Sequence, residues 1–188
     1  MDKQELWEDL MFEIASTRII KLFDREQKVL LGVGNKASTV MFVGDDPNLY
    51  ENGEGETKRE SSGEFFMKLC ELVGLGKNDF YLTNVIKCNA KMSEMTEEEV
   101  DFYKEILQME IALVNPKIIV PMGKEVMKIF VEEDHRIDEI RGKEFNWSGG
   151  IKLIPIHAPS YLVKHEDKQK GSPRWFTWQD LKSIKGMM

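Results

Sequence analysis

Short apolar runs that alternate with helical patterns constrain this 188-residue chain more than any other feature. Four nearly continuous apolar runs end at Gly, Pro or polar residues; they span 39–43, 80–85, 118–121 and 152–156. Such runs are typical of parallel strands buried on both faces. Helical spacing covers the segment from Leu6 to Phe23 and residues 64–75, 96–114, 124–132 and 175–184. We therefore predict a three-layer α/β/α domain with a central four-stranded parallel sheet.

Length, charge and cysteine content narrow the class of protein. The chain has the length of one domain, 1–188, and we expect a monomer. It has no apolar run of ~20 residues and no signal-peptide pattern, so we expect a cytoplasmic protein with no membrane partner. The net charge of −7 argues against a protein that coats nucleic acid, but it leaves binding at a local groove open. The only cysteines, Cys70 and Cys88, are interpreted as reduced thiols.

Two adjacent carboxylates follow the first predicted strand, in the sequence Gly44-Asp45-Asp46-Pro47-Asn48. Ligands of parallel α/β sheets collect beyond the carboxyl ends of the strands, so this turn is a candidate site. Carboxylates on a tight turn can act as a general base or hold a metal ion. No second acidic cluster completes a set of oxygen ligands, so we expect no metal site. A turn in which an Asp caps the following segment is the alternative interpretation.

Polar residues also follow two other predicted strands. Asn84 carries an amide whose donors and acceptor suit the edge of a planar heterocycle, and a hydrogen-bonded turn residue is the alternative. His157 stands where an imidazole can donate to a developing anion, or can serve as a structural hydrogen-bonding group. The segment after it suits phosphates or forms a solvated loop; its cationic residues are Lys164, His165, Lys168, Lys170 and Arg174.

These segments, taken in order, resemble those of uracil-DNA glycosylases, most closely the branch whose typical members carry an iron-sulfur cluster. The similarity is spread over Val43-Gly44-Asp45-Asp46-Pro47, Tyr81-Leu82-Thr83-Asn84-Val85-Ile86-Lys87-Cys88, Asn115-Pro116-Lys117, Pro159-Ser160-Tyr161-Leu162 and Trp178-Gln179-Asp180-Leu181. The resemblance implies a glycosylase fold and a DNA-repair enzyme that flips a base out of DNA. Such an enzyme hydrolyses the N-glycosidic bond of deoxyuridine or a related deaminated nucleoside.

The resemblance also implies roles for individual residues. Asp46 stands where other branches place the carboxylate that orients water, whereas the iron-sulfur branch usually has its acid at the position of Asp45. Asn84 corresponds to the amide that reads the uracil edge, beside Gly44 of the same pocket. Leu162 falls near the wedge that fills the gap left by the flipped nucleotide. The loop that contacts the DNA backbone includes Pro159, Ser160 and Lys164.

The sequence departs from the family pattern at the cluster ligands. Cys88 stands at one ligand position, but the others correspond roughly to Ser16, Ile19 and Tyr103. We therefore predict no iron-sulfur cluster and no other cofactor, with apolar packing around the N-terminal helix in its place.

Other departures concern the reaction itself. A gapless alignment places Ala158 at the family's catalytic His, with His157 one residue earlier, so the imidazole of His157 points to the opposite face unless a bulge restores it. The family's base-stacking Phe is missing, with Tyr50 and Phe65 as candidate substitutes, and Asn48 replaces the Tyr that excludes thymine in other branches.

Three functions follow from these observations. The first is a glycosylase that removes uracil or a related deaminated base from single-stranded or mismatched DNA, with Asp46, Asp45 and His157 as catalytic candidates. The second is a catalytically weak or inactive module of the same fold that binds uracil or DNA. The third is a nucleosidase acting on a soluble nucleotide, which the acidic composition permits.

Overall fold

The computed structural model describes residues 2–16 and 30–188, and its centre is a sheet of six strands in the order β1-β3-β2-β4-β6-β5. The four inner strands are parallel and correspond to the four apolar runs; they are β3 (Tyr81–Asn84), β2 (Val40–Gly44), β4 (Ile118–Pro121) and β6 (Lys152–Leu153). The predicted four-stranded sheet is corrected by two antiparallel edge strands, β1 (Val33–Gly34) and β5 (Phe145–Asn146). Each edge strand has two residues, too few to show a periodic pattern.

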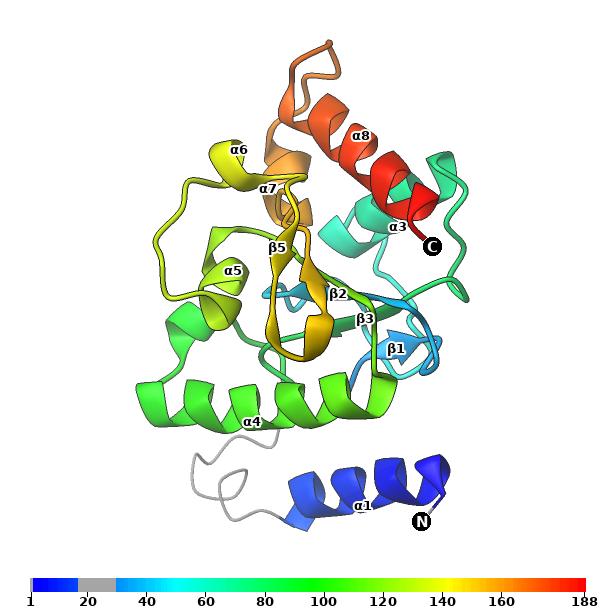
Figure 1. The fold of residues 1–188 in the computed structure, drawn as a ribbon, viewed down its shortest axis with the longest axis vertical. Helices are drawn as coiled ribbons and strands as arrows, with labels where there is room; N and C mark the ends of the chain where they lie inside the picture. The colour runs from blue at the N-terminus through cyan, green and yellow to red at the C-terminus, as the bar shows by residue number, and fades with distance from the viewer. Residues whose placement is uncertain (1, 17–29) are drawn as a thin grey trace.

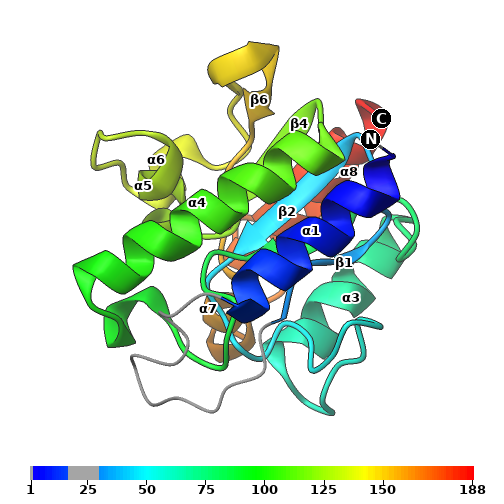
Figure 2. The ribbon, with the colours of Figure 1, turned by 90° about the horizontal axis from the view of Figure 1, so that it is seen from below.

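Helices cover both faces of the sheet, so the predicted three-layer α/β class is confirmed (Figure 1). One face packs against α1 (Lys3–Ser16) and α4 (Glu97–Val114), which run alongside β2 in Figure 2. The other packs against α3 (Ser62–Leu72), α7 (Pro159–Lys164) and α8 (Pro173–Gly186). The remaining helices are α5 (Lys124–Phe130), α6 (Ile137–Ile140) and the short 3-10 helices Met92–Glu94 and Ser148–Gly150. The end of the predicted N-terminal helix, including Ile19 and Phe23, lies outside the described residues.

The central strand β2 shows why the inner strands read as continuous apolar runs. Its side chains alternate between two cores: Met41 and Val43 pack under α1 and α4, whereas Val40 and Phe42 pack under α3 and α8. All four are completely buried. A strand buried on both faces in this way favours apolar side chains on both of them, and β2 therefore reads as a continuous apolar run between two helical layers.

Local sequence also defines where the helices near the site begin. The Ser61 hydroxyl accepts from the Glu64 amide at the start of α3, and the Ser172 hydroxyl accepts from the Trp175 amide at the start of α8. Pro159 opens α7, where its fixed φ favours the first turn and its missing N–H is not needed. No helix in the described part of the chain is long and apolar enough to cross a bilayer.

Candidate active site

The turn after β2 holds the Asp46 carboxylate in a buried position. Its Oδ1 accepts hydrogen bonds from the Asn48 backbone N–H at 2.9 Å and from the Asn48 amide at 3.3 Å. Its Oδ2 accepts from the Ser62 hydroxyl at 2.5 Å. Because Ser62 is the first residue of α3, this hydrogen bond fixes the turn to the start of that helix. Asp46 is only 4% exposed, and both of its oxygens have partners within the protein.

The neighbouring Asp45 is in a different environment. It is half-buried, and its Oδ1 accepts a hydrogen bond of 2.9 Å from the Met92 backbone N–H. Burial raises the pKa of its carboxyl to about 6, although the Met92 N–H and the charge of Lys91 act in the opposite direction. Asp45 therefore changes protonation close to neutral pH, as a general base in a catalytic site does.

Asn84, the last residue of β3, lies directly beside this turn. Its Oδ1 accepts from the Asp46 N–H at 3.1 Å, and its Nδ2 donates to the Asp46 carbonyl at 2.9 Å. An amide has two acceptor lone pairs and two N–H groups, so one acceptor and one donor stay available for a ligand. Gly44 permits this approach, since a Cβ there would lie 2.9 Å from the Asn84 Oδ1.

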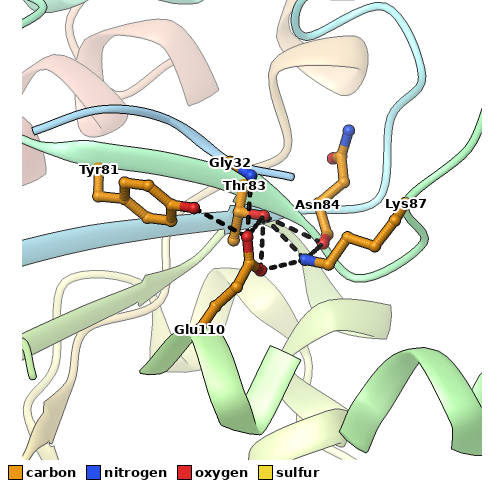
Figure 3. Close-up of polar contacts among 6 residues, drawn as sticks. All are labelled: Gly32, Tyr81, Thr83, Asn84, Lys87 and Glu110. Atoms are coloured by element: carbon orange, nitrogen blue, oxygen red, sulfur yellow. Dashed lines mark hydrogen bonds and ion pairs between the residues drawn. The ribbon is translucent and has the colours of Figure 1, made fainter. Parts of the chain in front are cut away.

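A buried ion pair fixes the end of β3 that carries Asn84 (Figure 3). The ammonium of Lys87 donates to the Glu110 carboxylate, to the Asn84 carbonyl and, at 2.8 Å, to the Thr83 hydroxyl. Glu110 comes from α4 and also accepts from the Tyr81 hydroxyl and the Gly32 N–H, both at 2.8 Å. Lys87 and Glu110 are completely buried, so each depends on the partners of this network.

This pair was not predicted, although the sequence contains a signal for it. Lys87 interrupts the apolar stretch around Ile86 and Cys88, and Glu110 interrupts the buried face of α4 beside Ile106 and Ile111. One charged residue within each of two otherwise apolar segments indicates a buried ion pair. Only the fold shows that the two residues are in contact.

Two hollows adjoin the turn that contains the acids. A cleft of about 630 Å³ is lined by Asp45, Asp46, Ala158, Pro159 and Ser160, together with the lysines Lys91, Lys104, Lys124 and Lys128. A cavity of about 300 Å³ is lined by Pro47, Asn48, Tyr50, Asn84 and Asn89. The acids, the amide and the start of α7 therefore converge at the carboxyl ends of β2, β3 and β6, where ligands of such sheets bind.

Comparison with known proteins agrees with the family resemblance of the sequence motifs. The family model described as "Uracil DNA glycosylase superfamily" matches residues 31–182. The chain belongs to this superfamily. It is 31% identical to the Type-4 uracil-DNA glycosylase of Thermotoga maritima over 169 residues, which cover 86% of this chain and 88% of the relative. It is 29% identical to the Type-4 uracil-DNA glycosylase of Archaeoglobus fulgidus over 167 residues, 85% of this chain and 84% of the relative. The predicted family, and a glycosylase-type hydrolase at the level of that family, are confirmed.

His157 lies outside both hollows of this superfamily member. Ala158 lines the cleft, whereas the His157 ring is 1% exposed and stacks on Tyr161 with ring centroids 5.4 Å apart. Neither ring nitrogen has a hydrogen-bond partner within the described part of the chain, and the nearest carboxylate oxygen, of Asp138, is 3.5 Å from Nε2. Burial lowers the pKa of this imidazole, so it is neutral at physiological pH.

The remaining candidate residues lie in several places. Tyr50 is buried and lines the smaller cavity, where burial raises the pKa of its hydroxyl. Phe65 lies instead in a groove between α3 and α8. Leu162 is 1% exposed within the core, whereas the preceding residue, Tyr161, is 39% exposed. Lys164 is exposed at the end of α7.

The residues at the expected ligand positions do not fit a four-thiolate iron-sulfur cluster. Cys70 and Cys88 are the only cysteines, and they pack in the two separate cores on opposite faces of the sheet. Tyr103 is a buried residue of α4, and Ile19 lies outside the described residues. Within residues 2–16 and 30–188, no three His, Cys, Asp or Glu side chains are grouped to hold a metal ion. The absence of a cluster stays a prediction.

Proposed function

We propose that this protein hydrolyses the N-glycosidic bond of deoxyuridine, or of a related deaminated nucleoside, in DNA. One observation carries the proposal: two acids and an amide at the ends of neighbouring strands meet through the paired hydrogen bonds between Asn84 and the Asp46 backbone. Membership of the uracil-DNA glycosylase superfamily supports it. The target base must leave the helix to reach these groups, so the proposal includes base flipping.

The two acids take different roles in this proposal. Asp45 lines the cleft and has a pKa of about 6, so at neutral pH it is mostly ionised and can orient the attacking water and stabilise the cationic sugar. Both oxygens of Asp46 already accept hydrogen bonds from Asn48 and Ser62. Asp46 therefore shapes the turn and holds Asn84, instead of acting on water as the resemblance implies.

Asn84 and the 300 Å³ cavity form the proposed base site. The free acceptor and the free N–H of the Asn84 amide match the N3–H donor and the O4 acceptor of uracil. Tyr50 and Asn48 line the same cavity, so they are the residues that define its shape toward other bases. The network of Lys87 and Glu110 keeps the backbone of Asn84 in position for this contact.

The larger cleft is the proposed site for the DNA backbone. Four lysines line it and are assigned to contacts with phosphate groups: Lys91, Lys104, Lys124 and Lys128. The last three also form ion pairs with carboxylates near the cleft, and the chain as a whole carries a net charge of −7. Pro159 and Ser160 lie in the same cleft. Because Leu162 is buried and Tyr161 is exposed, we assign the contact with the gap left by the flipped nucleotide to Tyr161.

The test is release of free uracil from labelled single-stranded and mismatched oligonucleotides by wild type, Asp45→Asn and Asp46→Asn. Asp45→Asn removes the carboxylate that orients water, so its rate of uracil release is expected to fall by roughly two to three orders of magnitude. Losing one group that stabilises the transition state has an effect of about this size in other enzymes. Asp46→Asn is expected to keep more activity. The opposite order of the two variants would return the water-orienting role to Asp46, and no release by wild type would refute the enzyme.

One observation favours a second candidate, a module of the same fold that binds uracil or DNA with little turnover. The imidazole of His157, the second group implied by the resemblance to act on the base, does not line either hollow. Tight binding of uracil-containing DNA without release of uracil, measured with the same oligonucleotides, would select this candidate.

A further inference from the structure

A groove of about 550 Å³ runs between α3 and α8, apart from the two hollows beside the acids. Aromatic rings form much of its wall, from Phe65, Trp175 and Trp178. Both tryptophans are half-buried, and Leu72 at the edge of the groove is 76% exposed. A surface that combines several partly exposed rings in one groove is typical of a binding site for an apolar or planar partner.

The charges in this groove have a single sign. Every charged residue that lines it is basic, namely Lys68, Lys168 and Arg174, whereas the chain carries a net charge of −7. The guanidinium of Arg174 is occupied, since it donates to the carbonyls of Leu162 and Val163 and lies over the Phe65 ring. The two lysines have exposed side chains that a phosphate can reach, and Lys68 also pairs with the Glu64 carboxylate at 3.0 Å. The groove is complementary to an anion.

Flat apolar rings beside lysines match one kind of anion better than others. Single-stranded DNA offers unpaired bases, which stack on aromatic side chains, and phosphates, which pair with lysines. A duplex keeps its bases stacked within the helix and does not present their faces to such rings.

Two helices, α3 and α7, link the groove to the proposed active site, although the groove and the two hollows share no lining residue. Helix α3, which forms one wall from Phe65 onward, begins at Ser62, whose hydroxyl donates to Asp46. Arg174 in the groove donates to two carbonyls near the end of α7. The first turn of α7, Pro159 and Ser160, lines the cleft beside the acids. Figure 1 shows α3, α7 and α8 together on the same side of the sheet.

We propose that the groove between α3 and α8 binds single-stranded DNA that flanks the nucleotide in the active site. This inference rests on the proposed function, because that function supplies the DNA strand. The rings of Trp175 and Trp178 stack on bases of the flanking strand, and Lys68 and Lys168 contact its phosphates.

The experiment measures binding of the full-length protein to a fluorescently labelled, uracil-free oligothymidylate by anisotropy at several salt concentrations. Trp175→Ala is expected to weaken binding by on the order of tenfold, since it removes one stacking surface. Lys68→Glu with Lys168→Glu is expected to weaken binding and to lower the salt slope by about 1.4, or roughly 0.7 for each lost phosphate contact. Circular dichroism melts check that the variants are folded.

The matched control is Lys117→Glu with Lys143→Glu, which changes the net charge equally at exposed lysines that do not line the groove. This control is expected to keep a salt slope closer to that of wild type. Equal affinity and slope for the control and the groove variant would overturn the proposal. So would a dimer in sedimentation that Trp175→Ala dissociates, because the occupant would then be a second copy of the chain.

The two proposals fail in different ways. Binding of oligothymidylate through the groove without any release of uracil from a uracil-containing oligonucleotide would support the groove and reject the enzyme. Release of uracil with unchanged binding by the groove variants would reject the groove and support the enzyme.

Discussion

Two buried polar regions near the carboxyl ends of β3 and β6, which lie on either side of β2 and β4 in the sheet, have opposite surroundings. Beside β3, Lys87 and Glu110 form an ion pair in which Thr83, Tyr81 and backbone groups complete the hydrogen bonds. After β6, His157 is buried to the same degree and neither ring nitrogen has a hydrogen-bond partner within residues 2–16 and 30–188. Burial is therefore the same in the two regions, and only the partners differ.

The difference shows how this fold uses polar groups in its interior. A buried charge without a partner is strongly unfavourable, so Lys87 and Glu110 depend on each other for the stability of both. A neutral imidazole can stay buried at a smaller cost in folding free energy. Burial lowers the pKa of His157, so the ring carries no charge that needs a partner. The network therefore fixes the position of Asn84, whereas His157 contributes packing against Tyr161.

The largest effect is expected for Glu110→Ala. This change leaves the Lys87 ammonium buried and unpaired, and removing one partner of a buried pair costs about 3–5 kcal/mol. Urea denaturation at pH 7 measures the free energy of unfolding. The control is Lys87→Met with Glu110→Leu, which removes both charges and is expected to lose less stability than the single variant. A double variant less stable than Glu110→Ala would show that the buried pair is a net stabilising interaction.

Asp45 lies between the two extremes, since it is half-buried and accepts a hydrogen bond from Met92. The role proposed for Asp45 requires its ionised form, which becomes the main form above its pKa of about 6. The rate is therefore expected to rise with pH through about 6 and to be roughly tenfold lower at pH 5 than at pH 7. The measurement is the pH dependence of kcat/KM on a single-stranded substrate, and a flat profile between pH 5 and 7 would exclude Asp45 as the base.

Sequence patterns predicted the central sheet because its strands are buried on both faces. Met41 and Phe42 enter different cores, so neither face of β2 tolerates a polar residue and the apolar run is unbroken. The edge strands β1 and β5 escaped prediction because backbone pairing, rather than a side-chain pattern, defines them. Helix α7 was missed for a similar reason: its six residues are too few for helical periodicity to show.

The candidate site was predictable in part. Parallel strands end at the same edge of a sheet, so the sequence indicated that the acids after β2 and Asn84 after β3 lie close together, as the structure places them. The sequence did not indicate that the Asp46 backbone binds the Asn84 amide, or that Lys87 reaches Glu110 on α4. These contacts depend on how a helix packs on the sheet, which local patterns do not specify.

The smallest effect, and the clearest test of the contrast, is expected for His157→Phe. Phe keeps a ring against Tyr161 and removes two unpaired nitrogens, so the variant is expected to be as stable as wild type at pH 8, or more stable by up to about 1 kcal/mol. Burial lowers the His157 pKa below its ordinary value of 6.5, so below that pH the unfolded chain binds more protons and wild type loses stability. The advantage of the variant should therefore widen from pH 7 to pH 5 in urea denaturation, with His135→Phe as the control for loss of a half-buried imidazole. A destabilised variant, or an advantage that shrinks at low pH, would show that His157 has a partner when it is charged.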